Sequence, residues 1–139
     1  MMYLTRKVEF CAAHHLVSEQ LSAEENVREF GKCARRAPHG HNFVLEVTLR
    51  GEVQPRTGLV FNLAALKTLL QELIVAWLDH RDLNCLPEFS GLVPSSEVLA
   101  QQIWKKLAAV SFIPAQLHEI RLWETGNNSV TYRGEGEGS

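Results

Sequence analysis

Three histidines lie where the sequence predicts the buried faces of two strands. His14 ends a stretch, residues 4–14, in which the even positions are mostly apolar, and His39 and His41 open a second stretch with apolar odd positions. Residues two apart on a strand point to the same side, and neighbouring strands lie only about 4.8 Å apart. Three imidazoles can therefore converge on one Zn²⁺ and leave a fourth position open for water or substrate, as in a catalytic zinc site.

The alternative is that these histidines are structural. An isolated His-Gly-His is common in loops, and one histidine at a strand end is usually a hydrogen-bonded core residue. Three histidines at matching strand positions favour the metal interpretation. We assign His15 to the surface because it points to the opposite face from His14, and we assign His118 to the outer positions of a later strand.

Cys33 is the candidate base or nucleophile. It lies six residues before His39 and directly after Lys32, and a nearby cation would favour its thiolate, the reactive form. The competing interpretation is a small buried filler, which we adopt for Cys11 and Cys85.

Asp79 and His80 follow the apolar stripe of a predicted helix. A histidine oriented by a carboxylate can hold or relay a proton near neutral pH. A charged helix C-terminus, where a histidine interacts favourably with the helix dipole, explains the pair equally well.

Glu124 shares a predicted strand face with Ile120 and Leu122. An unpaired carboxylate on an apolar face is costly, so it requires hydrogen-bond donors. A ligand with an amino-pyrimidinone edge would supply two parallel N–H groups. The alternative is a glutamate at a strand end whose side chain reaches water.

The elements that must position these residues form an α+β domain. We predict strands at 4–14 and 39–51, helices at 63–78 and 97–109, and strands at 117–125 and 129–133, with Asn62 and Ser95 or Ser96 as helix N-caps. The order ββααββ favours a four-stranded antiparallel sheet with two helices on one face. Residues 18–38 form a long excursion with a short helix near 23–30, and excursions of this length are usually functional.

The whole chain has the properties of one ordinary globular domain. Its 139 residues fit a single domain, 1–139, in which residues 134–139 form a frayed tail. A formal charge of −2 and the absence of a basic stripe argue against a nucleic-acid partner, and no apolar stretch approaches the ~20 residues that span a bilayer. Three cysteines are too few for a disulfide scaffold, and the first residues do not form an apolar signal segment, so we expect a cytoplasmic protein.

Several motifs in order make the chain similar to a known family. They are residues 10–14 (FCAAH), 30–33 (FGKC), 39–42 (HGHN), 78–80 (LDH), 83–84 (LN) and 124–125 (ET). Together they resemble the 6-pyruvoyltetrahydropterin synthase family, which includes the 6-carboxytetrahydropterin synthases of queuosine biosynthesis, over residues 3–135. The resemblance implies the tunnelling fold (T-fold), in which sheets join as trimers into a barrel. It also implies a homohexamer of two stacked trimers, with active sites between subunits.

The resemblance also implies roles for individual residues. His14, His39 and His41 match the zinc ligands, Cys33 matches the catalytic cysteine, and Asp79 with His80 matches the pair that works with it. Glu124 matches the residue that anchors the pterin ring, and Ser95, Ser96 and Glu97 match a pterin-pocket motif. The family often has Thr in place of Ser95 and usually Asp in place of Asn62.

The implied activity is a lyase reaction on a small pterin. It converts 7,8-dihydroneopterin triphosphate to 6-pyruvoyl-5,6,7,8-tetrahydropterin with loss of triphosphate, a carbon–oxygen lyase step of tetrahydrobiopterin biosynthesis that needs zinc and no redox cofactor. The alternative product is 6-carboxytetrahydropterin, formed with acetaldehyde by a carbon–carbon lyase, and a second alternative is a non-catalytic pterin- or metal-binding module. The five residues between Cys33 and His39 favour the pyruvoyl branch. Phosphate contacts and a solvated charged loop are both open interpretations of the nearby cations, which are Arg28, Lys32, Arg35 and Arg36.

Overall fold

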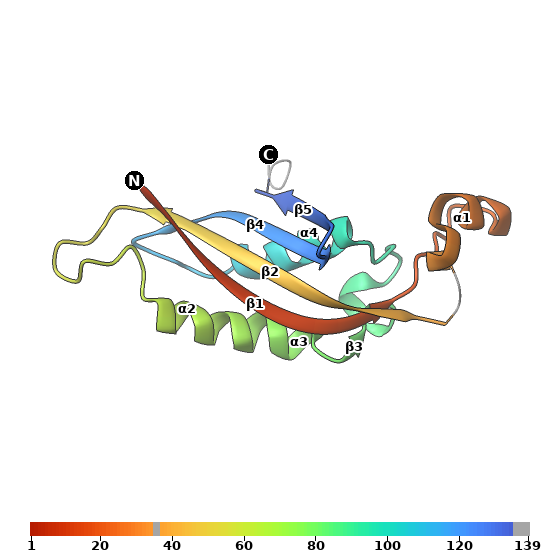
Figure 1. Cartoon of the computed structure of the whole chain (residues 1–139), viewed down its shortest axis with the longest axis horizontal. Helices are drawn as coiled ribbons and strands as arrows, with labels where there is room; N and C mark the ends of the chain where they lie inside the picture. The colour runs from red at the N-terminus through yellow and green to blue at the C-terminus, as the bar shows by residue number, and fades with distance from the viewer. Residues whose placement is uncertain (35–36, 135–139) are drawn as a thin grey trace.

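A five-stranded sheet forms the centre of the computed structural model, which describes residues 1–34 and 37–134. The strands, in the sheet order β3-β1-β2-β4-β5, are β1 (Met2–His14), β2 (His39–Gly51), β3 (Arg81–Asp82), β4 (Gln116–Thr125) and β5 (Asn128–Tyr132). The helices are α1 (Ala23–Phe30), α2 (Leu63–Leu70), α3 (Ala76–Leu78) and α4 (Ser96–Ala108). Figure 1 shows α1 beyond the end of the sheet at which β1 ends.

The predicted α+β architecture is confirmed, but the predicted number of strands is wrong. The additional strand, β3, is only two residues long and pairs in parallel with Ala12 and Ala13 of β1. Two residues are too few to show an alternating pattern, so this strand cannot be predicted from residue periodicity. The sheet is therefore antiparallel except at this edge.

Between residues 63 and 78 the chain is helical throughout, as predicted, but it is not a uniform α-helix. Residues Gln71–Val75 form a π-helical segment between α2 and α3. Every fourth residue of this region is buried: Leu66, Leu70, Ile74 and Leu78. Four residues of an ideal α-helix turn about 40° past a full circle, so the wider π turn keeps Ile74 and Leu78 facing the sheet.

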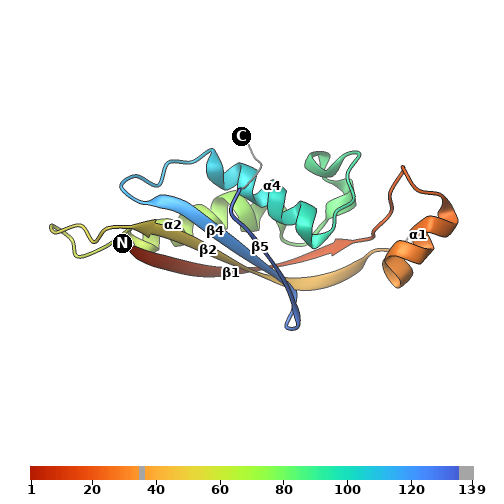
Figure 2. The ribbon, with the colours of Figure 1, turned by 90° about the horizontal axis from the view of Figure 1, so that it is seen from above.

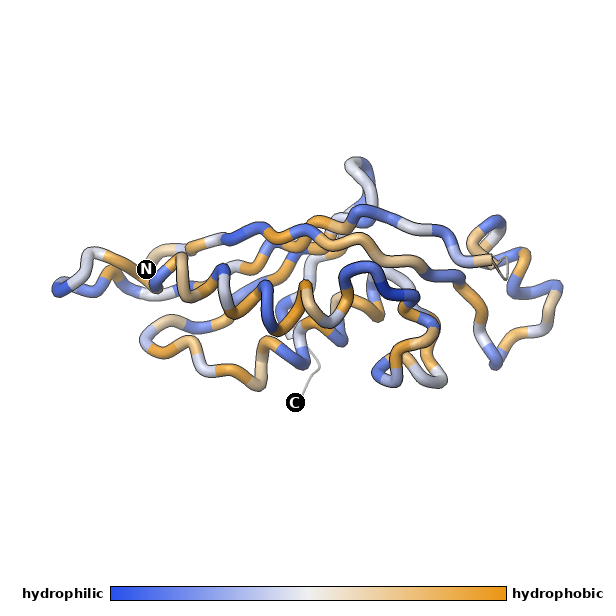
Figure 3. The backbone as a smooth tube through the Cα atoms, turned by 90° about the horizontal axis from the view of Figure 1, so that it is seen from below, coloured by the Kyte–Doolittle hydropathy of each residue, from blue (hydrophilic) through white to orange (hydrophobic). Residues whose placement is uncertain are grey.

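The core lies between one face of the sheet and the helices. Along β2 the odd positions from Phe43 to Leu49 are fully buried and belong to one core cluster with Leu66 of α2 and Ile103 of α4. Helix α2 packs under β1, and α4 packs under β4 and β5 (Figure 2). Orange and blue alternate along the strands in Figure 3, as expected for a sheet with one buried face.

At one end, β1 and β2 continue beyond β4 as a ribbon, and of the described strands only the two-residue β3 pairs with it there. Strands β1 and β2 pair along their whole length, from Met2 opposite Gly51 to His14 opposite His39. Strand β4 pairs with β2 only from Val44 onward. The histidines therefore lie on the part of β1 and β2 that extends beyond β4. Among the described residues, no helix combines the length and the apolar character needed to span a bilayer.

Candidate functional site

The register of β1 and β2 brings the three predicted histidines together. His14 lies opposite His39, and His41 lies opposite Ala12, so all three imidazoles are on the helix-covered face. Their nearest nitrogen atoms lie within 4.8 Å of one another. The ring centroids are 4.7 Å apart for His14 and His39, and 4.9 Å apart for His39 and His41. This arrangement suits a single metal ion bound between three imidazoles.

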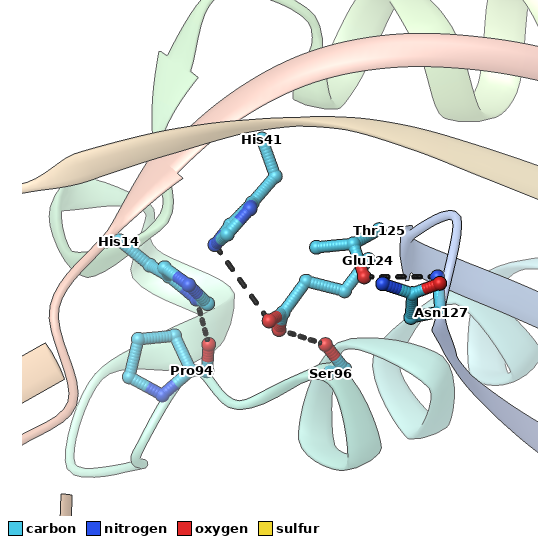
Figure 4. Close-up of polar contacts among 7 residues, drawn as sticks. All are labelled: His14, His41, Pro94, Ser96, Glu124, Thr125 and Asn127. Carbon is cyan, nitrogen blue, oxygen red and sulfur yellow. Dashed lines mark hydrogen bonds and ion pairs between the residues drawn. The ribbon is translucent and has the colours of Figure 1, made fainter.

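The structure fixes the tautomer of His14. Its side chain is 1% exposed, and Nδ1 lies 2.8 Å from the carbonyl oxygen of Pro94 (Figure 4). A carbonyl only accepts hydrogen bonds, so Nδ1 carries the proton and Nε2 keeps its lone pair for a ligand. Burial lowers the pKa of His14 below its usual value, and burial together with His14 lowers the pKa of His39. Both rings are therefore held in the neutral form that a metal requires.

His41 supplies the observation that most directly fits a cation. Its Nε2 atom is buried and makes no hydrogen bond, and it lies 3.7 Å from Oε1 of Glu124. A buried imidazole nitrogen without a partner is costly unless a ligand binds it. The three donors and the adjacent carboxylate therefore fit a bound metal cation.

Glu124 points into the same site from the end of β4. Its side chain is 27% exposed, and Oε2 accepts a hydrogen bond of 2.5 Å from the hydroxyl of Ser96. Ser96 itself is 7% exposed at the first residue of α4. Glu124 thus faces His14, His39 and His41, which we call the metal-type cluster, as the alternation of β4 predicts. Its hydrogen-bond donor comes from the protein.

The other two residues of the predicted pocket motif have different surroundings. The side chain of Ser95 accepts a hydrogen bond from the backbone N–H of Val98 and caps α4. Glu97 is exposed in the first turn of α4, where a negative charge interacts favourably with the helix dipole. Substrate contacts of Ser95 and Glu97 stay predictions.

Asp79 and His80 form the expected pair. Oδ2 of Asp79 lies 3.0 Å from Nδ1 of His80, and Oδ1 accepts the backbone N–H of Cys11 at 2.8 Å. The hydrogen bond from Cys11, followed by the contact with His80, lowers the pKa of Asp79. His80 is 82% exposed and has a left-handed backbone with φ 60°, a costly conformation that is common at functional sites. Its Nε2 is thus presented to solvent beside an ionised carboxylate.

Cys33 lies in a separate part of the chain. It belongs to the 3₁₀ turn Gly31–Ala34, and its carbonyl oxygen accepts the N–H of Leu16, two residues beyond His14. Within residues 1–34 and 37–134, no hydrogen bond or ion pair joins Cys33 to the histidine cluster or to Asp79 and His80. The described residues thus show no direct polar contact between Cys33 and the pair formed by Asp79 and His80.

The predicted burial of two cysteines is wrong. Cys11 and Cys85 are exposed, not buried fillers: Cys11 lies on the exposed face of β1, and Cys85 ends the 3₁₀ turn Leu83–Cys85. His15 is half-buried, and its backbone N–H and carbonyl both bond to the side chain of Asn84. His118 is also half-buried, against Tyr3 at 4.7 Å between ring centroids. Arg28 and Lys32 are exposed, and Arg35 and Arg36 lie outside the described residues.

Comparison with known proteins identifies the family of the chain. A family model described as 6-pyruvoyl tetrahydropterin synthase matches residues 3–135. The chain is 46% identical over 135 residues to the 6-pyruvoyl tetrahydrobiopterin synthase of Poecilia reticulata, covering 96% of this chain and 90% of that protein. It is 43% identical over 133 residues to the one from Pongo abelii, covering 95% and 91%. The chain belongs to the 6-pyruvoyl tetrahydropterin synthase family.

A solved structure agrees with this assignment. The 6-pyruvoyl tetrahydropterin synthase of Caenorhabditis elegans superposes with a TM-score of 0.90 at 41% identity, covering 96% of this chain and 95% of that one. The T-fold expected for a member of the synthase family is thus confirmed for the single chain.

Two features of this synthase-family site escaped the sequence reasoning. The Pro94 carbonyl that orients His14 carries no sequence signal, because every residue has a carbonyl group. Asn84 holds both backbone groups of His15 at 2.9 and 3.0 Å. Its amide side chain was visible in the sequence, but nothing in the residue pattern placed it beside the end of β1.

Proposed function

We propose that this chain is a zinc-dependent 6-pyruvoyltetrahydropterin synthase. It would convert 7,8-dihydroneopterin triphosphate to 6-pyruvoyl-5,6,7,8-tetrahydropterin and release triphosphate. The observation that carries the proposal is the convergence of His14, His39 and His41 beside Glu124, in a chain whose relatives at 43–46% identity are named 6-pyruvoyl tetrahydrobiopterin synthases.

The histidine cluster would hold the metal close to the substrate side chain. Bound zinc acts as a Lewis acid on the side-chain hydroxyls, which makes the adjacent C–H and O–H protons easier to remove. The protein keeps His14 neutral by burial and oriented by Pro94, so the cluster is ready to bind a metal without rearranging its tautomer.

Glu124 would anchor the pterin ring. A carboxylate offers about four acceptor positions, and Ser96 uses one of those on Oε2. The remaining positions on Oε1 and Oε2 can accept the two parallel N–H groups of an amino-pyrimidinone edge. Because Oε1 also lies 3.7 Å from Nε2 of His41, a ring held there would lie next to the three histidines.

Proton transfer would use Cys33 with Asp79 and His80. The exposed Nε2 of His80 can accept or donate a proton while Asp79 holds Nδ1. Because Cys33 and this pair make no direct contact within the described chain, we propose that they meet across the subunit boundary of a homohexamer, the assembly that the family resemblance implies.

Product analysis tests the proposed reaction. Zinc-loaded protein is incubated with 7,8-dihydroneopterin triphosphate, and triphosphate, pterin products and acetaldehyde are measured. We expect triphosphate with 6-pyruvoyltetrahydropterin. Acetaldehyde as the main product would instead assign the carbon–carbon lyase activity of the 6-carboxy branch, and the absence of turnover with pterin still bound would indicate a non-catalytic module.

Two variants separate metal chemistry from proton transfer. His39→Ala should lose bound zinc, measured by elemental analysis, together with turnover. Cys33→Ala should keep zinc at one ion per chain and lose turnover by about 10²-fold or more, the usual contribution of a general base. Full turnover in Cys33→Ala would exclude the proposed role of this thiol.

A further inference from the structure

Three consecutive residues at the start of α4 make three different polar contacts. The carbonyl oxygen of Pro94 accepts from Nδ1 of His14 at 2.8 Å, and the side chain of Ser95 accepts from the N–H of Val98 at 3.2 Å. The hydroxyl of Ser96 contacts Oε2 of Glu124 at 2.5 Å. Figure 4 shows both contacts leaving one short segment, that of Pro94 toward His14 and that of Ser96 toward Glu124. The segment thus touches both the metal-type cluster and the carboxylate.

The direction of the Ser96 contact follows from its chemistry. An ionised carboxylate only accepts hydrogen bonds, so the hydroxyl must donate its single proton to Oε2. With that proton committed and the side chain 7% exposed, Ser96 has no donor left for a ligand. Hydrogen bonds to a charged acceptor are shorter and about twice as strong as neutral ones.

The segment is fixed to the core, so it can hold its contacts in place. Ser95 caps α4, and its carbonyl accepts the N–H of Leu99 at 2.8 Å. Leu99 and Ile103 of the same helix are fully buried under the sheet. Movement of the segment would therefore require α4 to shift within the core.

We propose that Ser96 is a positioning residue that acts through Glu124 and does not contact the substrate. Its hydroxyl holds the carboxylate with Oε1 toward His41, while Pro94, two residues earlier, holds His14. The two sites are thereby kept at a fixed separation by one segment. That the positioned carboxylate receives a pterin rests on the proposed function, whereas its placement beside the metal ligands does not.

A double-mutant cycle tests this proposal. Ser96→Ala, Glu124→Gln and the double variant are compared with the native protein by the Kd for zinc, measured by chelator competition, and by the Kd for 7,8-dihydropterin, a ring without side chain or phosphates. We expect Ser96→Ala to weaken pterin binding about tenfold, the usual effect of losing a hydrogen bond to a charged group. Glu124→Gln should weaken it further, and adding Ser96→Ala to Glu124→Gln should change neither Kd by more than about twofold.

Zinc binding gives the readout that does not depend on the pterin. Glu124→Gln should weaken zinc binding several-fold, because a negative charge beside the ion is lost, and Ser96→Ala should have a smaller effect in the same direction. If the native protein binds zinc but no pterin, the proposed function fails, and the zinc cycle alone still decides the role of Ser96.

Two controls keep the result interpretable. Ser96→Thr retains the hydroxyl and should restore both Kd values to within about threefold of native. Ser111→Ala makes the same chemical change at an exposed residue just beyond the other end of α4 and should alter neither. Additive effects of Ser96→Ala and Glu124→Gln on pterin binding would show that Ser96 contacts the ligand directly and would overturn the proposal. Zinc and pterin affinities unchanged by Ser96→Ala would overturn it as well.

Discussion

At the scale of single residues, the site depends on which nitrogen of each imidazole carries the proton. Pro94 assigns the proton of His14 to Nδ1, and Asp79 assigns that of His80 to Nδ1. In both rings Nε2 is left without a proton, but the consequences differ. The buried Nε2 of His14 can bind a metal, whereas the exposed Nε2 of His80 can take up a proton. The neighbouring oxygen atom therefore sets the chemistry that each ring can perform.

Metal-free protein should lose stability as the pH falls below about 6.5. The folded pKa values of His14 and His39 lie below their unfolded values, so the unfolded chain binds more protons in this range. The stabilisation is complete above pH 6.5 and is lost as the pH falls toward the folded pKa values. Each extra proton bound by the unfolded chain lowers the free energy of unfolding by about 1.4 kcal/mol per pH unit. Urea unfolding with a chelator at pH 7.5 and 5.5 measures the loss.

The variant His14→Phe serves as the comparison for this pH effect. Its absolute stability will fall because the Pro94 carbonyl loses its donor, but the decrease between the two pH values should be smaller than in native protein. An equal decrease in both proteins would show that His14 does not contribute to the pH dependence.

The left-handed backbone of His80 should have a measurable cost. A non-glycine residue near φ 60° is strained by about 1–2 kcal/mol, and glycine is not. His80→Gly should therefore unfold with a free energy about 1 kcal/mol higher than His80→Ala, measured by urea denaturation. Both variants lack the imidazole and should lose turnover equally. Equal stability of the two variants would argue against strain at this position.

At the scale of elements, the strands were the part of the structure that sequence predicts best. Alternation in β1, β2 and β4 depends only on neighbouring residues, so it placed His14, His41 and Glu124 on one face without knowledge of the fold. Alternation along a strand does not predict which residues of separate elements contact each other. The bond between Ser96 and Glu124 joins residues 28 positions apart, and it exists only because α4 begins below the end of β4.

The start of α4 gives a prediction on stability. Ser95→Ala removes the side chain that accepts the N–H of Val98 and should lower the free energy of unfolding by about 1 kcal/mol. Ser95→Asp keeps a capping oxygen and adds a charge that the helix dipole favours, so it should retain native stability. Thermal unfolding of the two variants measures the difference, and equal loss in both would contradict a capping role.

At the scale of the whole molecule, the sheet has open edges. Most of β1 has a strand partner on one side only, because β3 covers just Ala12 and Ala13, and β5 ends the sheet on the other side. Unpaired strand edges tend to pair with other chains. The face of the sheet away from α2 and α4 is covered by no helix of the described residues (Figure 2). Both features are compatible with the barrel assembly that the family resemblance implies.

The proposed assembly predicts the mass in solution. Light scattering should give six times the chain mass of 15.7 kDa. The mass should not change when zinc is removed, because His14 lies at the end of β1 next to β3, beyond the long unpaired edge of the strand. A monomer that retained full turnover would contradict both the hexamer and the proposed meeting of Cys33 with His80 across subunits.

The extension of β1 and β2 beyond β4 has a consequence for local opening of the structure. Near His14 and His39 the backbone hydrogen bonds of the ribbon are supported by few neighbouring strands, so transient fraying there should require much less energy than global unfolding. A metal bound by histidines of both strands would link β1 and β2 at this end and oppose their separation. Amide hydrogens of residues 40–43 should then exchange with deuterium markedly more slowly in zinc-loaded than in zinc-free protein, while those of residues 45–49 should exchange at similar rates in both.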